Sequence, residues 1–88
     1  MLLVIYDLSD DKRRRELVKS LESYGKRVQE SAFEMELANY ERKRMIKEIK
    51  SIIDYEADNV RIYNIPKDAI PEIVGIDSSP ISETNIII

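Results

Sequence analysis

The stretch that decides the fold is residues 2–15, which read LLVIYDLSDDKRRR. It begins with five apolar or aromatic residues in a row, and a short run of this kind predicts a central strand buried on both faces. The run ends at a single carboxylate, Asp7. Ser9, Asp10 and Asp11 follow, and their side-chain oxygens favour the start of a helix because they accept hydrogen bonds from its free backbone N–H groups.

Three basic side chains, Arg13, Arg14 and Arg15, come directly after this helix start. A carboxylate that ends a strand and guanidinium groups that begin the next helix meet at one edge of the predicted sheet. There the acid can hold a divalent cation and the arginines can hold phosphate. The helical period turns Arg14 toward the core, with Arg13 beside it and Arg15 toward solvent. We therefore expect Arg13 and Arg14 to face Asp7, and the alternative is a surface loop of solvated charges.

The composition limits the chemistry that the chain can use. Its 88 residues include no cysteine and no histidine, which excludes a disulfide framework, a thiol nucleophile, a cysteine zinc site and a histidine general base. No apolar run approaches the roughly 20 residues of a membrane span. The first residues lack the basic region of a signal peptide. We expect a cytoplasmic protein that makes no membrane contact.

The net charge of −3 does not by itself indicate a nucleic-acid binder, but the charges are unevenly distributed. Residues 1–50 carry 12 Lys and Arg against 10 Asp and Glu, whereas residues 51–88 carry 2 against 7. The basic groups therefore gather in the first part of the chain, chiefly in the two predicted helices.

Apolar spacing predicts the elements that follow. The first helix covers about residues 10–24, and Gly25 is expected to end it as a left-handed cap. Residues 27–37 alternate between apolar and charged side chains, which predicts one half-buried strand or two short strands bent near Ser31.

A second helix is predicted over residues 39–54, with Asn39 as its cap. Lys43, Lys47 and Lys50 lie along one side face of this helix. Two interpretations remain open for that face: a solvated surface paired with neighbouring glutamates, or a ridge that contacts phosphates.

The remaining elements are strands. Residues 60–65 alternate, residues 73–76 predict a short strand, and residues 85–88 end in three isoleucines that should join a sheet edge of this chain or of a partner. The order predicts an α+β fold: a ferredoxin-like βαββαβ sandwich with an antiparallel sheet and two helices on one face. We expect one domain over residues 1–88, with a core at about 2–76 and a flexible segment and terminal strand at 77–88.

Three segments together resemble the CRISPR-associated protein two family, the small partner in spacer acquisition. They are residues 4–14 (VIYDLSDDKRR), 24–34 (YGKRVQESAFE) and 60–63 (VRIY), and the resemblance covers about residues 2–65. It implies a homodimer in which Asp7 faces its twin across the two-fold axis. It also implies that the C-terminal strand docks on the dimer partner.

The resemblance further implies an endonuclease that acts on single-stranded RNA, double-stranded DNA or both. Asp7 would be the catalytic residue and the ligand of Mg²⁺, with Mn²⁺ as the alternative ion, and Tyr6 would complete the catalytic strand end. The other reading is a non-enzymatic adaptor that bridges dimers of the CRISPR integrase partner protein and holds spacer DNA. The two readings do not exclude each other.

The family motifs also place nucleic-acid-binding residues. Arg14 matches a helix arginine, and Arg27, Ser31 and Phe33 match a motif of the second strand segment; Arg13 joins them from its position in the helix. Tyr6 and Phe33 have core packing as an alternative role. Two positions depart from the family pattern, since Glu30 stands where an aromatic or apolar residue is usual and Ala32 where valine is usual.

Overall fold

The computed structural model describes residues 1–75 and 86–87. Its elements follow the predicted βαββαβ order, with two further short strands. They are β1 (Leu2–Asp7), α1 (Asp11–Glu22), β2 (Lys26–Gln29), β3 (Ala32–Met35), α2 (Asn39–Ile52), β4 (Asn59–Asn64), β5 (Ile73–Val74) and β6 (Ile86–Ile87). The predicted α+β class is confirmed.

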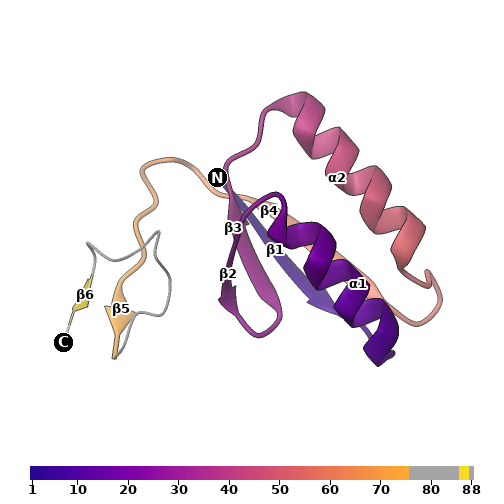
Figure 1. Cartoon of the computed structure of the whole chain (residues 1–88). Coiled ribbons are helices and arrows are strands. Elements are labelled where there is room, and N and C mark those ends of the chain that lie inside the picture. The colour runs from indigo at the N-terminus through magenta and orange to yellow at the C-terminus, as the bar shows by residue number, and fades with distance from the viewer. Residues whose placement is uncertain (76–85, 88) are drawn as a thin grey trace.

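Four strands form one antiparallel sheet in the order β2-β3-β1-β4. Both helices cover the same face of this sheet (Figure 1). This is the ferredoxin-like sandwich that the order of elements predicts. In the described part of the chain, neither helix is long and apolar enough to cross a bilayer.

β1 is the central strand, but only one of its faces is covered. Val4 and Tyr6 point toward the helices and are buried, whereas Ile5 is 38% exposed and Asp7 is exposed. The prediction of a strand buried on both faces is wrong, because both helices lie on one side and leave the other side bare. The core lies between sheet and helices and consists of Leu2, Val4, Tyr6, Leu8, Leu17, Leu21, Phe33, Met35, Met45 and Ile49.

The end of α1 differs from the prediction. Gly25 does not adopt the left-handed conformation, since Gly75 is the one residue with positive φ in the described part of the chain. Gly25 is instead required for a close approach to β3. A Cβ atom at this position would lie 2.3 Å from the carbonyl oxygen of Glu34, a distance that real contacts do not reach.

The start of α2 also differs by one residue. The cap is Ala38, and Asn39 is the first helical residue. Ala38 has no side-chain acceptor, so Glu41 supplies the capping bond: its carboxylate accepts a hydrogen bond from the backbone N–H of Ala38 at 2.9 Å. The inner face of α2 buries Met45 and Ile49.

Residues 27–37 contain two strands, which is the second of the two predicted arrangements. Glu30 and Ser31 form the turn between β2 and β3, and the strand register shifts between Arg27 and Gln29. The resulting bulge bends the hairpin at the end of β2. The hairpin tip lies beside the end of β1, because Tyr6 donates hydrogen bonds to the carbonyl oxygens of both turn residues.

The last strands form a small sheet of their own. β5 and β6 pair in parallel, apart from the four-stranded sheet (Figure 1). The isoleucines of β6 thus join a strand of the same chain. Residues 76–85 and 88 lie outside the described residues, so the flexible segment predicted at 77–88 lies outside them too, apart from β6.

Candidate functional site

Asp7 ends β1 on the bare face of the sheet. It pairs with Asn59 of β4, and it shares its face with Leu3 and Ile5 because alternate residues of a strand point the same way. Its side chain is exposed. Among the described residues the carboxylate accepts no hydrogen bond and forms no ion pair. Both oxygens are therefore available to an external ligand.

Tyr6 points to the opposite face, into the core, and is 3% exposed. Its hydroxyl donates a hydrogen bond to the carbonyl oxygen of Glu30 at 2.9 Å, and its backbone N–H donates to the carbonyl of Ser31 at 3.1 Å. Burial raises the pKa of the Tyr6 hydroxyl more than the nearby guanidinium groups of Arg27 and Arg14 lower it. The hydroxyl thus stays protonated and fastens the β2–β3 turn to the end of β1.

Arg27 contributes to the same turn from β2. Its Nη2 and Nε atoms donate to the carbonyl oxygen of Glu30 at 2.6 and 3.2 Å. It lies opposite Phe33 in the strand register, so it belongs to the helix side of the sheet and not to the face that carries Asp7. The guanidinium remains on an exposed residue and keeps donors for a ligand.

Phe33 and Ser31 differ sharply in accessibility. Phe33 is 0% exposed and packs beside Tyr6, with 6.3 Å between ring centroids. A side chain without accessible surface cannot stack on a base, so the structure assigns Phe33 to the core. Ser31 is half-buried at the tip of the hairpin, and its hydroxyl has no hydrogen-bond partner among the described residues.

The two helix arginines have separate partners. Arg14 reaches back to the end of β1, where its Nη2 donates to the carbonyl oxygen of Leu8 at 2.9 Å, and it also pairs with Asp11. Arg13 is bound instead by the residue before the cross-strand partner of Asp7: its Nε donates to Oδ2 of Asp58 at 2.7 Å. Arg13 thus lies at the expected end of the sheet, but its guanidinium is engaged by a buried carboxylate and not by Asp7.

Asp58 is a residue next to the site that the sequence pattern missed. Its side chain is wholly buried and also accepts hydrogen bonds from the backbone N–H groups of Ser9 and Asp54, at 3.0 and 2.9 Å. The hydrogen bond from Arg13 and then that from Asp54 hold the pKa of Asp58 far below its usual range. The sequence pattern gives no signal for this contact, because Asp58 lies 45 residues from the arginine that it binds.

A single chain provides few ligands for a cation. Within the described residues there is no group of three or more His, Cys, Asp or Glu side chains that could hold a metal. Asp7 nonetheless has the right donor type, since Mg²⁺ prefers oxygen ligands and often takes only one or two carboxylates from protein. One chain therefore supplies one of the two carboxylates that such a site can use.

The lysine face of α2 is also free of protein partners. Lys43, Lys47 and Lys50 are exposed and form no ion pair within the described residues. The two glutamates expected to neutralise them are used elsewhere: Glu41 caps α2, and Glu48 accepts hydrogen bonds from two side chains that precede β2, Ser20 and Tyr24. The predicted pairing of these lysines with neighbouring glutamates is therefore wrong.

Comparison with known proteins gives consistent matches. The family model of CRISPR associated protein Cas2 matches residues 1–72. The chain is 37% identical over 84 residues to CRISPR-associated endoribonuclease Cas2 1 of Chloroflexus aurantiacus, a match that covers 94% of this chain and 90% of that relative. It is 45% identical over 64 residues to the corresponding protein of Mycobacterium tuberculosis, with 73% and 56% covered. It is 41% identical over 61 residues to Cas2 4 of Rhodospirillum rubrum, with 69% and 49% covered, so the chain spans about half the length of these last two relatives.

Solved structures agree with the sequence matches. A hypothetical protein of Thermus thermophilus, TT1823, superposes with a TM-score of 0.82 at 34% identity and covers 90% of this chain and 94% of its own. Cas2 of Streptococcus pyogenes gives a TM-score of 0.72 at 33% identity, with 76% and 87% covered. With the family model and a near full-length relative in agreement, this chain belongs to the CRISPR associated protein Cas2 family.

Proposed function

We propose that this chain is a homodimeric, Mg²⁺-dependent endonuclease in which two Asp7 carboxylates form one metal site. The observation that carries the proposal is the position of Asp7, which is exposed, without a partner among the described residues, and placed on the uncovered face of the sheet. A second copy that packs on this face would bring a second carboxylate to the first.

The bare face has the apolar surface that such pairing needs. Ile5 is 38% exposed and Tyr63 is 44% exposed, and both lie on the Asp7 side of the sheet with Leu3. A chain of this size buries only about 60–65% of its unfolded surface and gains stability when an apolar face is covered. In a two-fold symmetric dimer, a residue that lies near the symmetry axis faces the same residue of the partner.

Mg²⁺ or Mn²⁺ bound between the two carboxylates would supply the Lewis acid for phosphodiester hydrolysis. The chain's own residues have supporting roles at the same end of the sheet. Arg14 binds phosphate oxygens near the end of β1, Arg27 binds a phosphate of the same strand from the other face of the sheet, and Ser31 donates a hydrogen bond at the hairpin tip. Tyr6 keeps the hairpin in place through its protonated hydroxyl. Arg13 acts by holding the start of α1 against Asp58 and so positions Arg14.

The names of the relatives support a choice of substrate class. Those of Chloroflexus aurantiacus and Mycobacterium tuberculosis are named endoribonucleases, which favours single-stranded RNA as the substrate here, with double-stranded DNA as the second candidate. The chain has no histidine to protonate the leaving oxygen, so that proton comes from solvent in this proposal.

The test is cleavage of labelled single-stranded RNA and duplex DNA with Mg²⁺, Mn²⁺ or EDTA. Wild type should cut, EDTA should stop it, and Asp7→Ala should be inactive while folded. Asp68→Ala is the matched control, because Asp68 is an exposed carboxylate on the loop after β4. Equal cleavage by Asp7→Ala, or a monomer by sedimentation at micromolar concentration, would contradict the paired site.

A second function is favoured by the free lysine face of α2: an adaptor that holds spacer DNA and bridges dimers of the CRISPR integrase partner. Three unpaired cations along one helix suit a row of backbone phosphates. In this reading the C-terminal strand docks on a neighbouring subunit.

The adaptor is tested by duplex binding at several salt concentrations. Binding should survive Asp7→Ala and fall when Lys43, Lys47 and Lys50 are changed together to Glu. The same charge change at exposed lysines elsewhere, Lys12, Lys19 and Lys67, is the control. Equal losses from both triple variants would indicate a general charge effect and no specific ridge.

A further inference from the structure

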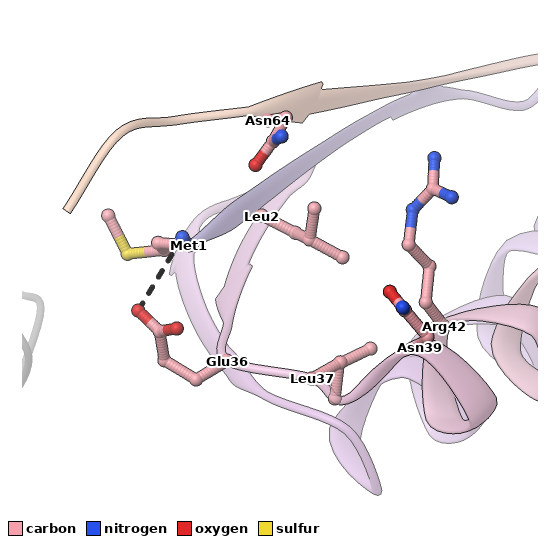
Figure 2. A pocket seen from close by; sticks show the side chains of 7 residues that line it. All are labelled: Met1, Leu2, Glu36, Leu37, Asn39, Arg42 and Asn64. Atoms are coloured by element: carbon pink, nitrogen blue, oxygen red, sulfur yellow. Dashed lines mark ion pairs between the residues drawn. The ribbon is translucent and has the colours of Figure 1, made fainter.

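A polar cavity lies at the end of the sheet opposite to Asp7. It has a volume of about 280 Å³ and opens between the start of α2 and the strands β1 and β4. Figure 2 shows Asn39 and Arg42 extending from the first turn of α2, and Asn64 pointing from β4 toward the same space. Leu2 and Leu37 supply its apolar wall. Side chains from a strand and a helix thus converge on one hollow.

The three polar side chains in this cavity have unused bonding capacity. Within the described residues, the carboxamides of Asn39 and Asn64 and the guanidinium of Arg42 form no hydrogen bond and no ion pair. Arg44 shows the contrast on the same helix, because its Nε donates to the hydroxyl of Tyr24 at 3.3 Å. All three residues are exposed, so these polar groups can be reached from solvent by a ligand.

The cavity has a positive bias. Its one acidic lining residue, Glu36, lies 3.7 Å from the amino group of Met1, which offsets its charge (Figure 2). Arg42 therefore remains as the uncompensated charge of the lining. An anionic ligand that also presents hydrogen-bonding edges would match this arrangement.

We propose that this cavity binds one nucleotide unit, from a free nucleotide or from the end of a strand. Arg42 engages the phosphate through paired N–H donors. The two carboxamides each offer a donor and an acceptor to a base edge, as Asn does in base recognition. Leu2 and Leu37 cover a face of the base. The volume lies at the small end of ligand sites, about 300 Å³ and upward, which suits one unit and no more.

This site is separate from the Asp7 site. Leu2 and Asp7 occupy the two ends of β1, which puts them about 17 Å apart at the rise of an extended strand. They also face opposite sides of the sheet. The inference therefore goes beyond the proposed nuclease and does not depend on it.

The test is an NMR titration of the isotope-labelled full chain with each of the four nucleoside monophosphates, with inorganic phosphate, and with a short 5′-phosphorylated oligonucleotide. A nucleotide should shift the signals of Asn39, Arg42 and Asn64. Arg42→Gln should weaken binding about tenfold, the typical effect of a lost charge-assisted hydrogen bond. Asn64→Ala should weaken it while leaving phosphate affinity unchanged.

Arg15→Gln is the matched control, since it makes the same substitution at an exposed arginine of α1 outside the cavity. Three results would overturn the proposal: no shift at the lining residues, equal affinity for inorganic phosphate and nucleotides, or equal losses from Arg42→Gln and Arg15→Gln. Tighter binding of the oligonucleotide than of any mononucleotide identifies a strand end as the source, and the reverse identifies a free nucleotide. Asp7→Ala should bind as wild type does, so failure of the nuclease leaves this test intact.

Discussion

Asp7 and Asp58 lie at the same end of the sheet and have opposite environments. The Asp58 side chain is wholly buried and accepts five hydrogen bonds, from Ser9, Arg13 and Asp54. Asp7 is exposed and accepts none from the described residues. A carboxylate whose oxygens accept hydrogen bonds from the protein stabilises the fold, whereas a carboxylate with free oxygens can bind a ligand. The difference separates a structural acid from a candidate catalytic one.

The sharpest test of this contrast is Asp7→Asn, which keeps the shape of the side chain and removes its charge. We expect cleavage to fall about 100-fold or more, the scale for loss of one electrostatic group at a reacting phosphate. Folding should change by less than about 0.5 kcal/mol, as is usual for exposed sites. Cleavage rates and urea unfolding of the same preparations measure both quantities. Retained cleavage would remove Asp7 from the mechanism.

The converse substitution, Asp58→Asn, should mainly affect stability. The side-chain amide that replaces the carboxylate places its own N–H donors against N–H donors of the protein. Arg13 also loses its buried counter-charge. We expect a clear drop in Tm, larger than that of Asp7→Asn, with the folded fraction still active. An unchanged Tm together with lost cleavage would reverse the roles assigned to the two acids.

The two helix arginines extend the comparison, since each belongs to one of these regions. Arg13→Gln should lower Tm because it leaves Asp58 buried without its cation. Arg14→Gln removes a hydrogen bond to the Leu8 carbonyl and a phosphate ligand of the proposed site, so it should reduce cleavage more than Tm. Paired melting and cleavage measurements on both variants check this, and identical profiles would argue against separate roles.

The smallest effect is a pH dependence. The folded-state pKa of Asp58 is lowered, so at acid pH the unfolded chain binds a proton more readily than the folded chain does. The stability that Asp58 supplies is fully present above about pH 5 and declines as the pH falls below about 4. The Tm difference between wild type and Asp58→Asn should narrow over that range. A difference that widens toward acid pH would contradict the assigned shift, and Lys43→Gln serves as a control with a constant difference.

Local sequence signals predicted much of this molecule. The apolar run of β1, the acidic start of α1 at Asp10 and the apolar spacing of the later segments led to the βαββαβ order and to Asp7 at a strand end. The errors share one cause, which is contact between distant segments. Whether both faces of β1 are buried depends on where the helices pack, and they pack on one side. Gly25 is required by the close approach of β3 and not by a left-handed cap.

The same cause limited the prediction of the site. Helical spacing correctly placed Arg14 near the end of β1. The period of a helix contains no information about Asp58, which binds Arg13 although it lies 45 residues further along the chain. The burial of Phe33 and the use of Glu41 and Glu48 as hydrogen-bond acceptors within the fold also arise from tertiary packing.

By itself, the sequence determined the order of elements, the strand end at Asp7 and the absence of thiol and imidazole chemistry, because residue type and periodicity act over one or two turns of chain. Tertiary structure alone decided which face of the sheet stays bare, which acid is buried and which cations remain free. Those outcomes depend on hydrogen bonds and packing between residues that only folding brings together.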